Sequence, residues 1–316
     1  MENQIDLSHP KTAREYLRLF LTGFAMGSAD IVPGVSGGTM AFILGVYETL
    51  IDAIKSFDTT AIQMALKLKI KDVLDHVPWQ FLLTLGLGIL GAVFTLSRVL
   101  SDLLENQPLF IFAFFGGLIV ASILAIGIRV KWSAISLFTF IVGTVAAYLI
   151  VGLVPIEAEH SIPALFFSGM IAIIAMILPG ISGSFILLIL GQYEFVLGAV
   201  KSFDIVSVGS VGVGAVVGII GFSRILSWLL KNYEQATIAA LVGFMLGSLR
   251  KIWQEASTGA EQMDVLGTQE IGLAIGLVIA GFLLVSFLDH LQTKSNPVFR
   301  LFWHSDDEQA VPVSVE

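Results

Sequence analysis

The chain has 316 residues, of which 56% are hydrophobic and only 13% are charged, and its mean hydropathy is +0.88. Soluble domains carry about 25% charged residues, so this composition excludes an ordinary soluble domain and indicates an all-α integral membrane protein. With no cysteine, five scattered histidines and a net charge of −8, the sequence predicts no disulfide, no metal site and no nucleic-acid partner.

An amino-terminal tail precedes the first apolar stretch, residues 15–54, which is interrupted by Pro33-Gly-Val-Ser-Gly37. Proline and glycine end helices, so the stretch predicts a helical hairpin with this sequence at its tip. Either the tip lies at membrane depth, as in a re-entrant hairpin, or the arms are two complete spans of about 20 residues each. Non-helical backbone is tolerated at membrane depth only where protein or water covers it, so a re-entrant tip would line a site.

Three spans are predicted after this hairpin, and residues 61–75 before them predict an amphipathic helix on the cytoplasmic surface. A second hairpin at 163–200 is interrupted by Pro179-Gly-Ile-Ser-Gly183 and is followed by three more spans. The predicted spans are 80–100, 108–128, 134–154, 208–230, 236–250 and 270–288.

The two hairpins are copies of one another. Residues 32–58 and 178–204 are identical at 14 of 27 positions, and the similarity continues from 85–106 to 211–232. Repeated apolar segments interrupted by glycine and proline point to the binding site of a transporter. The predicted parts of the chain are a cytoplasmic tail (1–13), a first membrane repeat (14–154), a second, inverted repeat (155–288) and a cytoplasmic tail (289–316).

Positive charge sets the predicted orientation, because loops rich in Lys and Arg stay in the cytoplasm. Segment 55–78 carries four lysines, whereas the loop at 155–162 carries acidic residues and neither Lys nor Arg. The three spans between the hairpins then invert the second repeat relative to the first. Arg250 and Lys251 fall on the outer side of the membrane in this topology, against the positive-inside rule, and this is its weakest point.

Each hairpin tip has the composition of an anion site. Where a helix resumes after Pro-Gly, backbone N–H groups are free at its start, and glycine lets an oxygen-rich ligand approach them. The alternative is that proline and glycine only make the turn tight. The candidate ligands are Gly34, Ser36, Gly37, Gly38 and Thr39 in the first tip, and Gly180, Ser182, Gly183 and Ser184 in the second.

Charged residues recur at equivalent positions of the apolar repeats, where they are costly and therefore candidates for function. Arg98 and Arg224 are candidate anion ligands. Glu48 and Glu194 are candidates for coupling to protons, because a carboxylate in a low-dielectric site gains proton affinity. The alternative is that these side chains snorkel to the membrane surface.

Asp30 breaks the symmetry, because Met176 takes its place in the second repeat. It either caps the turn or forms a proton or cation site in one half only. We count it with the two glutamates as a candidate coupling residue.

The segments from Gly27 to Thr39 (GSADIVPGVSGGT) and from Ile177 to Ser184 (ILPGISGS) resemble the bacterial polyprenyl-phosphate transporter family, also called PopT-like proteins. The resemblance covers nearly the whole chain. It implies a multi-pass protein of the bacterial cytoplasmic (inner) membrane that returns undecaprenyl phosphate from the outer to the inner leaflet, for recycling in envelope synthesis. We expect the tips to hold the phosphate of this lipid and Arg98 and Arg224 to supply positive charge, roles that rest on their chemistry.

Two alternatives belong to other classes. Undecaprenyl pyrophosphate phosphatases of the BacA type share a Pro-Gly-x-Ser motif, but theirs continues with Arg-Ser-Gly and is joined by a Glu-rich motif. Here Gly37-Gly38-Thr39 and Gly183-Ser184-Phe185 follow, so charge stabilisation and metal binding are poorly supplied, and we expect no enzyme and no cofactor. A small-anion secondary transporter differs only in its cargo. The sequence leaves open the coupling ion, the preferred chain length and the oligomeric state.

Overall fold

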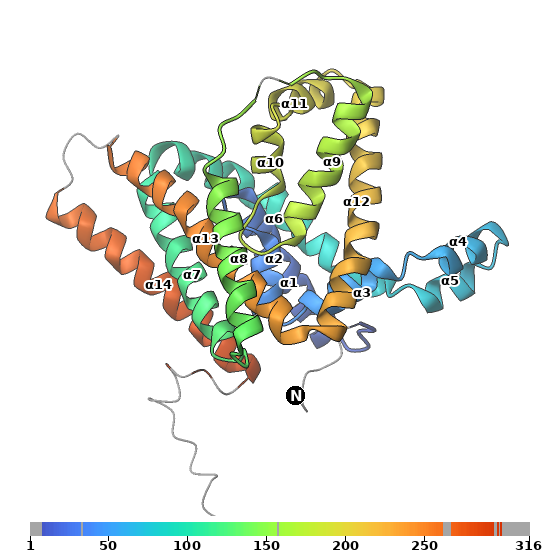
Figure 1. The fold of residues 1–316 in the computed structure, drawn as a ribbon, viewed down its shortest axis with the longest axis horizontal. Coiled ribbons are helices and arrows are strands. Elements are labelled where there is room, and N and C mark those ends of the chain that lie inside the picture. Colours follow the sequence, from blue (N-terminus) through green and yellow to red (C-terminus); the bar gives the residue numbers. More distant parts are fainter. Residues whose placement is uncertain are drawn as a thin grey trace, which may run out of the picture.

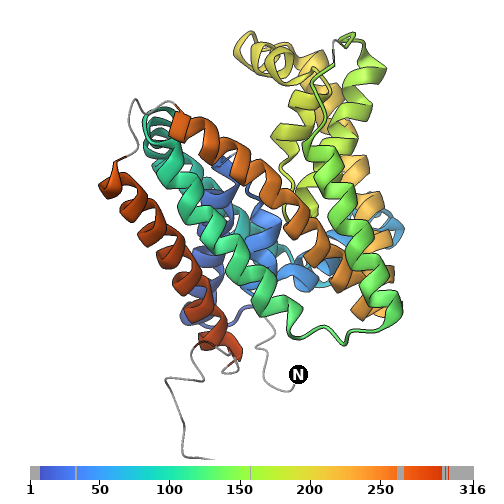
Figure 2. The same cartoon turned by 60° about the vertical axis from the view of Figure 1, so that its left-hand side comes forward.

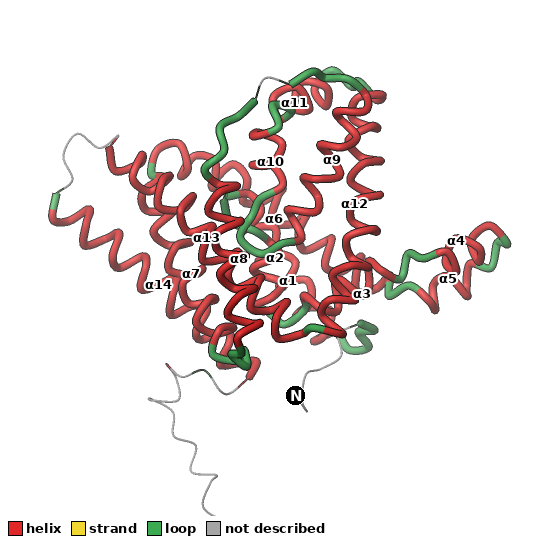
Figure 3. Tube along the Cα trace, in the orientation of Figure 1, coloured by secondary structure: helices red, strands yellow, loops and turns green. Residues whose placement is uncertain are grey.

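In a computed structural model, the described residues are 8–32, 34–156, 158–261, 267–293, 296 and 298, and their regular structure is entirely helical (Figure 3). The prediction of an all-α membrane protein is confirmed. Pro33, Glu157 and most of the predicted carboxyl-terminal tail lie outside the described residues.

Six of the described helices are long and apolar enough to cross a membrane, as the sequence predicts. Their ends lie within six residues of the predicted ones, with one exception. The span predicted at 236–250 is part of a helix that continues to Glu261, so Arg250 and Lys251 lie inside a helix and not in a loop. The six are α6 (Trp79–Asn106), α7 (Pro108–Gly127), α8 (Ala134–Val151), α12 (Ile205–Asn232), α13 (Glu234–Glu261) and α14 (Thr268–Thr293).

The second arm of each predicted hairpin is broken once more, at a glycine in the left-handed region. Gly45 (φ 70°) bends the first by 115° and Gly191 (φ 65°) bends the second by 109°. Each helix between tip and bend has seven residues, a rise of about 10 Å against the roughly 30 Å of a bilayer core. This geometry favours re-entrant tips over complete spans. The first hairpin is α1 (Ala13–Ile31), α2 (Gly37–Ile43) and α3 (Tyr47–Lys55), and the second is α9 (Ile162–Ile177), α10 (Gly183–Ile189) and α11 (Tyr193–Lys201).

Helix pairing repeats between the halves. In the first half α1 packs on α6, and in the second half α9 packs on α12. The later helices exchange partners between the halves, because α7 packs on α14 and α13 packs on α8. Figure 2 shows α14 (red-orange), α7 (teal) and α13 (orange) side by side. The halves are therefore interlocked; whether they are inverted across a membrane stays a prediction.

Glycines allow the backbones of paired helices to touch, at equivalent positions in the two halves. A Cβ atom at Gly88 of α6 would collide with the carbonyl oxygen of Phe20 in α1. The equivalent Gly214 of α12 approaches the carbonyl oxygen of Phe166 in α9 in the same way. Small residues at such contacts are typical of membrane helix packing, where close approach supplies the packing energy.

The first half has an insertion, residues 59–78, after Asp58, whereas the equivalent Asp204 of the second half is followed directly by α12. It contains α4 (Thr59–Leu66) and α5 (Ile70–His76), which project from the helix bundle at the right of Figure 1. The single amphipathic helix predicted at 61–75 is wrong, because the chain turns at Leu68 with φ 56°. At the start of α4 the Ala61 N–H donates to the Asp58 carboxylate at 2.8 Å and lowers the pKa of Asp58.

Contacts with the second half hold the first hairpin more firmly than its copy is held. Ser227 of α12 donates to Asp52 of α3 at 2.7 Å and receives a hydrogen bond from Lys55 at 3.0 Å. By contrast, α11 packs on α10 and α12 of its own half. Ile51 of α3 is accordingly fully buried, whereas its equivalent in α11, Leu197, is 38% exposed.

The helix contacts give a matched pair of substitutions in α6. Gly88→Ala should lower the free energy of unfolding by about 1–3 kcal/mol because its Cβ meets the Phe20 carbonyl. Gly86→Ala should leave it unchanged or raise it by up to about 1 kcal/mol, because the space around Gly86 is open and alanine favours the helix. Thermal unfolding in detergent compares the two; equal effects would contradict the packing argument.

Tyr47 offers a second matched pair. Its buried hydroxyl donates to the Ile177 carbonyl at 3.1 Å, so Tyr47→Phe should cost about 1–3 kcal/mol of stability by leaving that carbonyl unpaired. Tyr193→Phe, at the equivalent position of α11, should change stability by less than about 0.5 kcal/mol. Denaturation of both variants in the same detergent decides, and a larger loss for Tyr193→Phe would show that the hydroxyl bond is unimportant.

Candidate functional site

The tip of the first hairpin lies against the carboxyl end of α9, just before the tip of the second. The Ser36 hydroxyl points toward the carbonyl oxygens of Met176 and Leu178, at 3.4 and 3.3 Å, and Tyr47 takes the carbonyl between them. A helix end leaves such carbonyls without intrahelical partners. Figure 1 shows α2 below α10 in the middle of the molecule, so the predicted tips are brought together there.

The backbone donors of the first tip already have acceptors. The Gly37 N–H donates to the Asp30 carboxylate at 2.7 Å, the Gly38 N–H to the Ser36 hydroxyl at 3.1 Å, and the Thr39 N–H to the Ser36 carbonyl at 2.9 Å. The sequence predicted free N–H groups here, so the structure differs. Asp30 makes the bond expected of a capping residue and occupies the donor predicted for a bound anion.

The second tip is different in its chemistry. The hydroxyls of Ser182 and Ser184 share a hydrogen bond of 2.7 Å, and Ser182 makes no side-chain cap. Met176 stands where the first hairpin has Asp30, so no equivalent carboxylate approaches Gly183. Instead, a Cβ atom at Gly183 would lie 2.9 Å from the Ala172 carbonyl and 3.4 Å from Met176. The two tips are alike in sequence but not in hydrogen bonding.

Thr39, in the first turn of α2, is fully buried, and its hydroxyl has no hydrogen-bond partner among the described residues. Leaving a buried hydroxyl unpaired costs about 1–3 kcal/mol. Native structures seldom accept this cost without a reason such as an ordered water or ligand. The hydroxyl is thus a polar group available to a ligand beside the first tip.

The predicted charged residues lie away from this centre. Arg98 and Arg224 are exposed, and Arg224 donates to the Phe57 carbonyl at 3.2 Å, beyond the end of α3. Glu48 and Glu194 are exposed in the first turns of α3 and α11, after the bends. The structure therefore groups the tip residues with Asp30 and does not group them with these four.

One cation that follows directly after the predicted span 236–250, and that was not among the candidate site residues, lies at the tips. A Cβ atom at Gly34 would be 2.8 Å from Lys251 Cγ, and Lys251 Nζ lies 4.9 Å from the ring centroid of Phe185 in α10. Lys251 is 17% exposed and pairs with Glu255 at 2.5 Å. One turn earlier on α13, Ser248 lies against Gly180 of the second tip. The sequence signal that could have identified Lys251 is its position directly after an apolar span, on the same helix.

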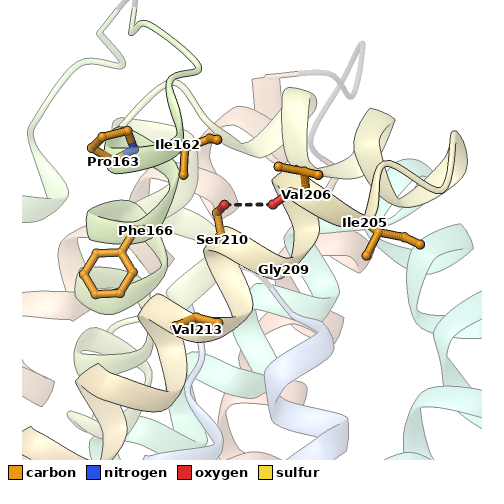
Figure 4. A pocket seen from close by; sticks show the side chains of 8 residues that line it. All are labelled: Ile162, Pro163, Phe166, Ile205, Val206, Gly209, Ser210 and Val213. Atoms are coloured by element: carbon orange, nitrogen blue, oxygen red, sulfur yellow. Dashed lines mark hydrogen bonds between the residues drawn. The ribbon is translucent and has the colours of Figure 1, made fainter.

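An apolar groove runs beside the second hairpin, between α9 and α12, with a volume of about 530 Å³ (Figure 4). Its one side-chain hydroxyl, that of Ser210, is bonded at 2.7 Å to the Val206 carbonyl of its own helix. The groove is suited to a hydrocarbon chain. The lining residues are Ile162, Pro163, Phe166, Ile205, Val206, Gly209, Ser210 and Val213.

Comparison with known proteins agrees with this architecture. Residues 26–270 match the model of the family described as undecaprenyl phosphate translocase-like. The chain is 43% identical over 255 residues to a polyprenyl-phosphate transporter of Vibrio cholerae, covering 80% of this chain and 83% of that protein. It is 31% identical over 250 residues to a polyprenyl-phosphate transporter of Staphylococcus aureus, covering 72% and 83%. No solved structure matches. The chain is a multi-pass membrane protein that belongs to the undecaprenyl phosphate translocase-like family.

Proposed function

We propose that this protein moves undecaprenyl phosphate from the outer to the inner leaflet of the bacterial cytoplasmic membrane, and so recycles the carrier for cell-envelope synthesis. The names of its relatives support the substrate class. The observation that carries the proposal is the contact between two broken hairpins inside a bundle of apolar helices. Transporters place their substrate sites at such helix breaks.

In this proposal the phosphate binds between the tips and the polyprenyl chain stays in apolar surroundings. Serine hydroxyls and glycine N–H groups of both tips suit phosphate oxygens, and the unpaired Thr39 hydroxyl adds a donor. To use the Gly37 N–H, the phosphate takes the place of the Asp30 carboxylate. The groove between α9 and α12 is suited to part of the chain. Arg98 and Arg224 serve the phosphate when alternating exposure brings them to it.

Leaflet-resolved movement of labelled undecaprenyl phosphate in proteoliposomes tests the function. Ser36→Ala/Ser182→Ala should slow movement about tenfold, because each substitution removes a hydroxyl at a tip. Ser122→Ala is the control, since that hydroxyl bonds to the Leu118 carbonyl within α7. Phosphate release from undecaprenyl pyrophosphate, recorded in parallel, should stay at background. Hydrolysis without movement would assign the protein to the phosphatases, and equal movement of a small anion would assign it to the small-anion transporters.

Proton coupling is part of the proposal, with Asp30, Glu48 and Glu194 as coupling residues. Asp30→Asn keeps an oxygen that can accept the Gly37 N–H but cannot gain or lose a proton. If Asp30 couples transport to protons, the transport rate of the variant should depend less on pH. We expect its slope against pH to be less than about half of the native slope. An unchanged pH profile at native rate would leave Asp30 with the capping role alone.

A further inference from the structure

We propose that Lys251 is the cation that binds the phosphate group at the hairpin tips, and that Glu255 holds its ammonium until phosphate takes its place. This inference rests on the proposed function, and it replaces the arginines as the first source of positive charge. The ligand class is a phosphate monoester, as in the headgroup of a lipid monophosphate.

Lys251 lies between the two hairpins. The carbon stem of its side chain covers Gly34 in the first tip, with Cγ at 2.8 Å from the position of a Cβ atom there. The ammonium at the other end lies 4.9 Å from the ring centroid of Phe185, three residues after Ser182 in the second hairpin. One side chain thus reaches from one tip to the other, and the aromatic face directs the charge toward the second.

A charged amine within a bundle of apolar helices is unfavourable without a partner, which makes Lys251 a candidate for function. Glu255, one turn later on α13, supplies that partner at 2.5 Å and is 33% exposed. The ammonium has three donors on a flexible four-carbon stem, so it can exchange one oxygen ligand for another by rotation alone. Phosphate can therefore replace the glutamate without a change in the helix.

Two other candidate cations are held elsewhere. Arg250 donates to the Tyr148 carbonyl at 2.9 Å and lies 4.3 Å above the ring of the same residue, which fixes it at the end of α8. Arg224 is exposed and bonded to the Phe57 carbonyl. Lys251 differs from both because its ion-pair partner is a side chain that can be displaced.

Binding to the purified full-length chain in detergent tests the assignment. Farnesyl phosphate, inorganic phosphate and farnesol serve as probes, and lipid movement in proteoliposomes is measured with the same preparations. The variants are Lys251→Met, Lys251→Arg, Glu255→Gln and the double variant Lys251→Met/Glu255→Gln. Lys131→Met, an exposed lysine between α7 and α8, is the control that removes the same charge.

Lys251→Met should weaken binding of farnesyl phosphate about tenfold or more, whereas Lys251→Arg and Lys131→Met should stay within about threefold of the native chain. Glu255→Gln should bind at least as tightly as the native chain, because the competing carboxylate is gone. The double variant should bind as weakly as Lys251→Met. Farnesol should bind equally to all variants.

Recovery of binding in the double variant would overturn the proposal, because Lys251 would then only neutralise Glu255. Native binding by Lys251→Met would overturn it too, and so would weaker binding by Glu255→Gln. The Glu255→Gln measurement keeps the proposal testable even if Lys251→Met does not fold. Absence of phosphate binding to the native chain would overturn both this inference and the proposed function. Binding that depends on Lys251 without lipid movement would support the site and refute the transport. Equal, Lys251-dependent binding of inorganic phosphate would support the site and refute a lipid headgroup as its ligand.

Discussion

Unpaired backbone inside an apolar bundle is the constraint on which the rest of this structure depends. Each hairpin breaks its helix at Pro-Gly, and lipid cannot satisfy the groups that the break exposes. The first hairpin satisfies the groups exposed at the second break, because Ser36 and Tyr47 donate hydrogen bonds to the three carbonyls that precede the second tip. The helix pairs, brought together at glycines, surround this contact. A site at the tips is therefore also the place where the two hairpins stabilise each other.

The two copies do not play the same part. Asp30 caps the first tip while Met176 occupies the equivalent position, and α3 is bonded to α12 while α11 remains on its own half. A transporter built from two repeats can alternate by exchanging the conformations of its halves. Under the proposed function, the contacts of α3 with α12 are those that such an exchange has to break. Among them, the ion pair between Asp52 and Lys231 is separable at modest cost, because both side chains are about half exposed.

Hydropathy and repetition were enough to predict the six spans and the position of both tips. They did not predict the bends, because a glycine within an apolar run is usually tolerated in a helix, and only the positive φ of Gly45 and Gly191 shows a break. They offered capping of the turn as one of two roles for Asp30, but not its donor, the Gly37 N–H, which depends on the turn itself. The end predicted for the span 236–250 was too early, because apolar character ends near residue 250 whereas the helix does not. Helix propensity depends on local composition, whereas the length of α13 depends on its packing against α7 and α8.

Both polar groups that suit the phosphate best are held by carboxylates of the protein itself. Asp30 holds the Gly37 N–H, and Glu255 holds the Lys251 ammonium. Binding in the proposed site is thus an exchange of partners, in which an anion replaces two others without leaving a buried cation unpaired. A lipid that lacks phosphate offers no anionic oxygen to the Gly37 N–H and the Lys251 ammonium, so it does not offset the cost of the bonds it would break. Selectivity for the phosphorylated carrier then follows from the intramolecular contacts, and not from the shape of the apolar groove.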